Sequence, residues 1–116
     1  MLLSKDQILN ASDRKFVDVE VPEWGGSVRL AVMSGTARDN YESSLVQIGK
    51  DGKAQNDLTN IRAKLVSACL VDENFEPIFT AAELGKKSGA VLDRLFDACN
   101  KLNAVTEAEV EQAAKN

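Results

Sequence analysis

The sequence predicts an α+β fold, in which an N-terminal β-hairpin packs on a bundle of about four to five mostly short helices. Two observations carry this prediction. β-Branched residues alternate strictly with polar residues near the N-terminus, which indicates strands. After them, helix-capping boxes and apolar residues at helical spacing recur along the chain. The length of 116 residues fits one domain, 1–116.

The hairpin is predicted from two alternating runs that a short loop connects. In residues 16–21, three valines face one way and two acidic side chains face the other, as in a half-buried strand. Pro22 ends this strand because it has no backbone N–H to donate. Residues 27–33 form the return strand, and either Gly25 or Gly26 can adopt the positive φ that the loop needs.

Trp24, the only tryptophan of the chain, lies in this loop. It either folds back over the edge of the core or anchors a partner protein, since Trp is enriched at binding hot spots. The first interpretation is favoured. The second makes the loop a candidate partner-binding site, formed by Pro22, Trp24, Gly25 and Gly26. The hairpin is also expected to join a partner's strand, because a two-stranded ribbon alone is marginally stable.

Three capping boxes predict short helices. Ser4 and Gln7 form the first box, which opens a helix near residues 5–11. Thr80 opens a second short helix that ends near Gly85. A third box at Thr106 opens a C-terminal helix with few large apolar residues, which is expected to fray or to depend on a partner.

Apolar spacing predicts three longer helices. One begins near Thr36, carries Tyr41, Leu45 and Ile48 on one face, and ends at a left-handed cap on Gly49. The other two cover residues 57–70 and 89–102 and are expected to pack together beneath the hairpin. Asn56 is expected to cap the first of these two, and its apolar stripe comprises Leu58, Ile61, Leu65, Ala68 and Cys69.

The helix at 89–102 is the strongest amphipathic segment of the chain, and Ser88 is a candidate for its cap. Its apolar face supplies further candidate partner-binding residues, Leu92, Leu95 and Phe96. Its apolar positions are Val91, Leu92, Leu95, Phe96, Cys99 and Leu102, and Asn103 can end it.

The connector between these two helices has two notable features. Asp72, Asn74 and Glu76 resemble the opening of a calcium loop, but Pro77 stands where such a loop needs Gly. A calcium site is therefore not expected. The apolar residues of the connector are expected to plug the core, and they are Phe75, Ile78 and Phe79.

Composition excludes several functions. The net charge of -4 and the absence of a basic run argue against nucleic acid and membrane surfaces as partners. Without His, neither a Ser-His-Asp triad nor a Cys-His pair can form, and Cys69 and Cys99 are interpreted as small buried side chains rather than metal ligands. The C-terminal acidic residues, including Glu107 and Glu111, are interpreted as a solvated face. No cofactor is expected, and catalysis is the least supported class of function.

Three stretches, in order along the chain, resemble the tail assembly chaperones of siphophages. They are residues 21–29 (VPEWGGSVR), residues 65–73 with the following 77–80, and residues 92–96. No single stretch is diagnostic, but the resemblance extends in order along nearly the whole chain. The resemblance implies a non-catalytic, self-associating protein that binds the phage tape measure protein, keeps it soluble and helps recruit tail tube subunits. It also implies action in the cytoplasm of the infected bacterial host and absence from the mature virion.

Helix-in-groove contact is one way in which such a protein could cover apolar stripes of the tape measure protein. The alternative function is a small phage structural protein, such as a neck or tail-completion component, that stays in the virion. The chain ends in Lys115 and Asn116, which a slippery A-rich codon run can encode. The resemblance therefore predicts a longer frame-shifted form that contacts the tail tube protein, unless Lys-Asn is simply a common polar ending.

Overall fold

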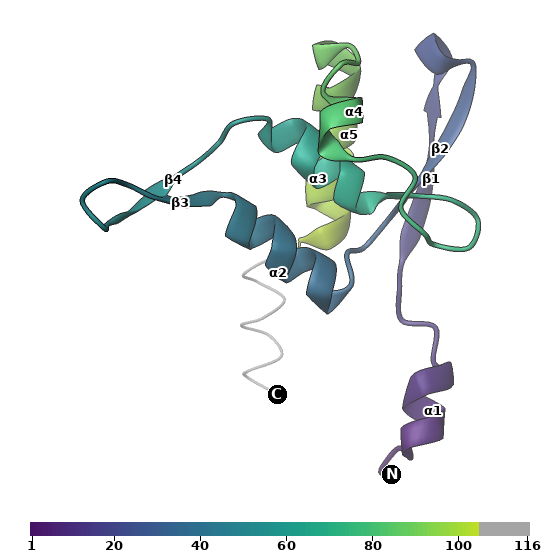
Figure 1. Ribbon diagram of the computed structural model, residues 1–116. Coiled ribbons are helices and arrows are strands. Elements are labelled where there is room, and N and C mark those ends of the chain that lie inside the picture. The colour runs from purple at the N-terminus through teal and green to yellow at the C-terminus, as the bar shows by residue number, and fades with distance from the viewer. Residues whose placement is uncertain (105–116) are drawn as a thin grey trace.

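The computed structural model describes residues 1–104, and its fold is α+β as the sequence predicts (Figure 1). The predicted box at Thr106 and the ending at Lys115 lie outside the described residues. No described helix is long and apolar enough to cross a membrane. The helices are α1 (Lys5–Asn10), α2 (Gly35–Ser44), α3 (Ile61–Cys69), α4 (Ala81–Leu84) and α5 (Gly89–Asn103), and a 3-10 turn, η1, covers Pro22–Trp24.

The predicted hairpin is confirmed. Strand β1 (Phe16–Val21) pairs antiparallel with β2 (Gly26–Ala31), and Val19 lies opposite Val28. The sequence did not indicate that a third strand, β5 (Leu70–Val71), pairs with the other side of β2. The sheet order is therefore β1-β2-β5, and β2 is its central strand.

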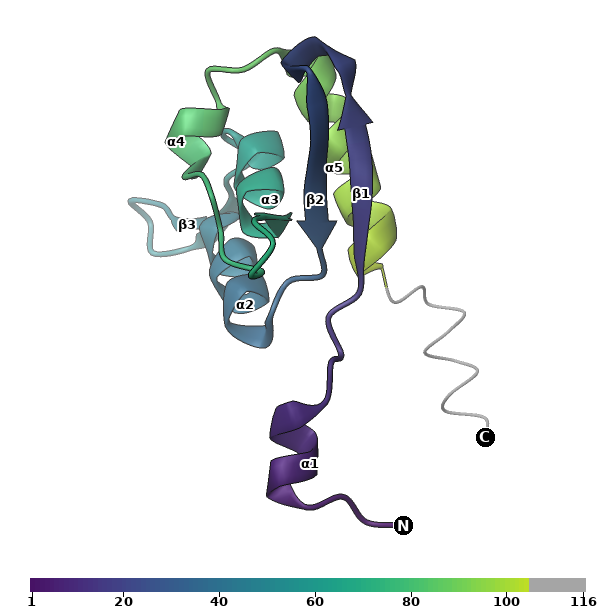
Figure 2. The same cartoon turned by 90° about the vertical axis from the view of Figure 1, so that its right-hand side faces the viewer.

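Helices α3 and α5 pack together and against the hairpin, as the sequence predicts (Figure 2). Leu65 of α3 and Leu95 of α5 are at most 1% exposed, and Leu30 of β2 completes the contact. Burial along β1 rises toward its end, from Val17 at 41% exposed to Val21 at 0%. The predicted burial of both cysteines is confirmed, and both are free thiols. The core cluster comprises Val21, Leu30, Ala63, Leu65, Val66, Cys69, Leu70, Leu84, Val91, Leu92, Leu95 and Cys99.

The predicted end of the second helix is wrong. Helix α2 ends at Ser44, and the chain then forms a ribbon of β3 (Val46–Ile48) and β4 (Ala54–Asn56). Valine and isoleucine favour extended backbone, and the Ser44 hydroxyl donates to the Tyr41 carbonyl at 2.6 Å. Gly49 therefore does not cap a helix, and its N–H donates to Lys53 across the ribbon turn.

The start of α3 also differs from the prediction. Asn56 belongs to β4, and Asn60 occupies the N-cap position with φ 58°. The Asn60 amide donates to the Ala81 carbonyl at 3.3 Å and so connects this helix start to α4. Leu58 precedes the helix and is 61% exposed, so it is not part of the apolar stripe.

The connector residues do not all plug the core as predicted. Only Phe79 packs against the core cluster. Phe75 instead packs edge-on against Phe16, with ring centroids 5.4 Å apart. Ile78 is 49% exposed. The prediction fails for Phe75 and Ile78 because a turn that begins at Asp72 carries them away from the helices.

Two segments extend away from the core (Figures 1 and 2). Helix α1 has no buried residue, and Ile8 and Leu9 on it are 58% and 70% exposed. Every residue of strands β3 and β4 is exposed, including Ile48 at 67%. Both segments form by local hydrogen bonds, and neither contributes a buried side chain to the core.

Candidate functional site

A groove opens beside β2, on the side where β5 pairs. On β2, strand β5 pairs only with Arg29 and Leu30. The chain then turns at Asp72, and Val71 forms a single antiparallel bridge with Pro77 after this turn. Within residues 1–104, the first half of β2, Gly26–Val28, therefore has a strand partner on the β1 side only. The space that this leaves is a groove of about 570 Å³. We call it the β2 groove.

Apolar side chains from two distant segments form the walls of the β2 groove. Trp24 and Val28 line it from the hairpin, and Ile78 and Phe79 line it from the connector. Trp24, Val28 and Phe79 are half-buried and also pack on the core, so their positions are fixed by the fold. Ile78 is the most exposed of the four. The groove is therefore a preformed apolar surface that is exposed to solvent.

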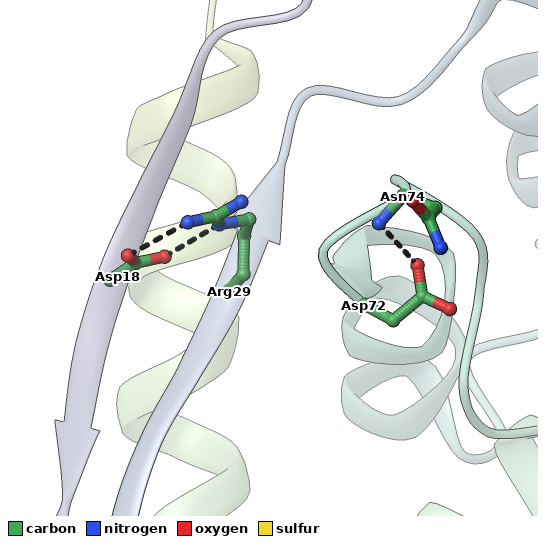
Figure 3. Close-up of polar contacts among 4 residues, drawn as sticks. All are labelled: Asp18, Arg29, Asp72 and Asn74. Atoms are coloured by element: carbon green, nitrogen blue, oxygen red, sulfur yellow. Dashed lines mark hydrogen bonds and ion pairs between the residues drawn. The ribbon is translucent and has the colours of Figure 1, made fainter.

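An ion pair lies on the hairpin side of the β2 groove. Arg29 donates to both carboxylate oxygens of Asp18, at 2.8 and 3.1 Å (Figure 3). The guanidinium carbon also lies 4.2 Å from the centre of the Phe16 ring. The hydrogen bonds from Arg29 lower the pKa of Asp18 below its ordinary value. Arg29 is therefore already paired and stacked, and Asp18 already neutralises its charge.

Asp72 and Glu73 supply further carboxylates on the opposite side of the groove. The Asp72 side chain accepts a hydrogen bond from the N–H group of Asn74 at 2.8 Å (Figure 3). It also accepts one from the N–H group of Glu76 at 3.1 Å. These bonds hold the turn, in which Phe75 adopts φ 63°. The pattern that resembled a calcium loop is thus an Asx turn, and Asp72 is fixed at the groove edge.

The predicted loop site lies at one end of this groove. Pro22 begins the 3-10 turn, and Gly25 follows it with φ 81°, a conformation that favours Gly. Trp24 packs against the core, which confirms the favoured interpretation, and it also lines the groove. A side chain at Gly26 would meet no atom within 4 Å, so the loop is open to approach.

The predicted site on α5 lies mostly inside the protein. Leu92 is 5% exposed and Leu95 is 0% exposed, because both pack in the core. Phe96 is half-buried at its edge. An ion pair of Arg94 with Glu23, at 2.9 Å, connects α5 with the hairpin loop. Partner binding by the α5 residues stays a prediction, and it would require their burial to change.

Sequence reasoning did not identify Ile78, Phe79, Asp72 and Glu73 as parts of a site. The sequence signal was a Pro-linked apolar pair next to an acidic turn, in a connector with no helical spacing. Their juxtaposition with Trp24 depends on the pairing of β5 with β2, which no local pattern indicates.

No family model and no curated protein sequence matches the chain. A search of solved structures finds the tail assembly chaperone of bacteriophage HK97, with a TM-score of 0.58 and 22% sequence identity. The two chains share a fold. The similarity covers 88% of this chain and 95% of the HK97 chain, so it includes the hairpin and the helices behind it rather than one motif.

Proposed function

We propose that the protein is a phage tail assembly chaperone. In this role it binds the tape measure protein, keeps it soluble until the tail tube forms, and helps recruit tube subunits. The protein is non-catalytic, self-associates, acts in the host cytoplasm and leaves before the virion is complete. The observation that carries the proposal is the fold shared with the HK97 chaperone over nearly the whole of both chains.

The physical chemistry of the surface supports this proposal. A tape measure protein exposes apolar stripes until it is sheathed, and exposed stripes of this kind aggregate. The β2 groove offers apolar side chains held in place by the core, while the net charge of -4 favours solubility of a complex. A binding protein with these two properties can cover a stripe without precipitating with it.

Co-expression with the tape measure protein of the same phage tests the proposal. The soluble fraction of the tape measure protein is measured after centrifugation, and an affinity tag on one chain tests whether the other co-purifies. We expect solubility to rise several-fold and the two proteins to co-elute. An unrelated acidic protein of similar size, expressed at the same level, is the control. Equal solubility with both proteins would overturn the proposal.

Mass spectrometry of purified virions separates this function from the structural alternative. A chaperone is released, so its peptides should be absent while tail tube peptides are abundant. A neck or tail-completion component would instead be present at a fixed ratio to the tube protein. That second result would favour the structural role.

A further inference from the structure

We propose that the β2 groove binds an apolar polypeptide segment that carries Lys or Arg beside its apolar residues. The shared fold extends over 88% of the chain and does not single out this groove. The inference rests on the proposed function for the source of the segment, which is the tape measure protein. The proposed contact surface is the β2 groove, which Trp24 and Ile78 line.

The size and lining of the groove suit apolar side chains. Its volume of about 570 Å³ lies within the range of about 300–1,000 Å³ that is typical of ligand-binding clefts. Trp24 supplies a broad aromatic surface, and Ile78 lines the same groove while 49% exposed. Covering these side chains removes apolar surface from water, which favours binding.

The charges around the groove select the flanking residues of the segment. The lining residues include one arginine and three acidic side chains. Arg29 forms its hydrogen bonds with Asp18, and its weaker electrostatic interaction with Glu73 leaves the groove with a net negative charge. Asp72 and Glu73 remain, and the Asx turn fixes the first of them at the edge. Lys or Arg beside the apolar residues would meet these two carboxylates, whereas an acidic flank would be repelled.

The other exposed apolar surfaces fit a bound segment less well. The β3–β4 ribbon exposes Val46 and Ile48, but the described cavities are not lined by either residue. Helix α1 exposes Ile8 and Leu9 and carries Lys5, so the N-terminal arm of a second copy is the main competing occupant. The experiment below distinguishes that arm from a tape measure segment.

Trp24 makes the binding directly measurable, because it is the only tryptophan of the chain. Two synthetic peptides share one apolar stretch from the tape measure protein, without Trp, and differ in flanks of two Lys or two Glu. We expect the Lys peptide to shift Trp24 fluorescence with a saturating curve and to bind about tenfold tighter than the Glu peptide, with weaker binding at high salt. No shift, or equal binding of both peptides, would overturn the proposal.

Substitutions in the full chain test whether the peptide binds in the β2 groove. Ile78→Asp is expected to abolish the shift, and Glu73→Lys is expected to weaken the Lys peptide about tenfold. Ile48→Asp on the ribbon and Asp39→Lys on α2 are matched controls that should bind normally. Glu73 and Ile78 are exposed, and circular dichroism checks that each variant is folded. If Ile78→Asp does not fold, Glu73→Lys still tests the proposal. Unchanged affinity of the Glu73→Lys variant for the Lys peptide would refute the role of the carboxylates.

The co-expression assay separates failure of this inference from failure of the proposed function. If the wild-type chain and Ile78→Asp solubilise the tape measure protein equally, the function stands and the groove is wrong. If the wild-type chain does not solubilise it but the Lys peptide binds, the function fails and the groove remains a peptide site. A fluorescence shift that follows protein concentration alone, and that Leu9→Lys removes, would assign the groove to a second copy and overturn the inference.

Discussion

Asn103, the last residue of α5, holds the end of that helix against the chain that leaves β2. Its side-chain oxygen accepts a hydrogen bond from the Met33 N–H at 2.7 Å. Its amide nitrogen donates to the Cys99 carbonyl at 2.9 Å and to the Cys69 sulfur at 3.3 Å. The Asn103 amide therefore connects α5, α3 and the hairpin. From the sequence, Asn103 was expected only to end the helix.

Replacing Asn103 is expected to destabilise the fold. Asn103→Ala removes all three bonds and leaves the half-buried Met33 N–H without its partner, which should lower the free energy of unfolding by about 1–3 kcal/mol. Urea denaturation measures the change. Asn100→Ala, at an exposed position on the same helix, is the control and should change stability by less than about 0.5 kcal/mol. Similar losses in both variants would show that the network adds nothing beyond helix propensity.

Leu95→Ala tests the core between α3 and α5. The side chain is 0% exposed, so the substitution leaves a cavity and should cost about 2–5 kcal/mol of unfolding free energy. Leu9→Ala removes the same atoms from a side chain that is 70% exposed on α1 and should cost far less. Thermal denaturation of the two variants gives the comparison, and a small loss for Leu95→Ala would contradict its place in the core.

Two capping boxes with the same geometry should differ in their effect on stability. In both, the cap hydroxyl accepts from a backbone N–H, at Ser4 and at Thr80. Thr80 begins α4, whose Leu84 is buried in the core, so Thr80→Ala should lower stability by about 1 kcal/mol. Ser4→Ala should leave global unfolding unchanged and only increase amide exchange in α1, because that helix has no buried residue. An equal loss in both variants would mean that α1 is packed in solution.

The Asp18–Arg29 pair predicts a specific dependence on pH. Arg29 lowers the pKa of Asp18 below its ordinary value of 3.8, so the folded chain binds fewer protons than the unfolded chain near that pH. The contribution to stability is present above about pH 4 and is lost as pH falls through the folded-state pKa. NMR titration of the Asp18 carboxyl should give a midpoint below 3.8, and Arg29→Gln should return it to the ordinary value. A normal midpoint in the wild-type chain would contradict the pair.

The two thiols should be inert in the folded protein. Cys69 and Cys99 are each 0% exposed. The hydrogen bond to Cys69 and burial raise the pKa of the Cys99 thiol. The same hydrogen bond lowers the pKa of the Cys69 thiol, so Cys69 is protected by its burial alone. A thiol reagent at pH 8 should modify neither residue in the native state, because neither is accessible, and both residues in denaturant. Rapid native-state reaction would show that α3 and α5 separate readily.

Much of the fold was predictable because its signals are local. Alternating valines indicated β1, and the boxes at Ser4 and Thr80 indicated two helix starts, since each pattern is complete within a few residues. The strongest amphipathic segment became α5, within one residue of its predicted end. These elements need no distant residue to define them.

The errors arose where local spacing allowed two outcomes or where pairing was distant. Tyr41, Leu45 and Ile48 have helical spacing, yet Ile48 belongs to a ribbon that closes through a turn after it. Strand β5 has two residues, and only its pairing with β2 makes it a strand. The β2 groove depends on that pairing, so the sequence indicated Trp24 but not the residues that face it.

Light scattering of refolding tape measure protein tests the central claim most directly. The denatured protein is diluted into buffer with an equimolar amount of this chain, of Ile78→Asp or of Ile48→Asp. We expect the wild-type chain and Ile48→Asp to suppress scattering, whereas Ile78→Asp should not. Scattering that the wild-type chain leaves unchanged would contradict a chaperone function.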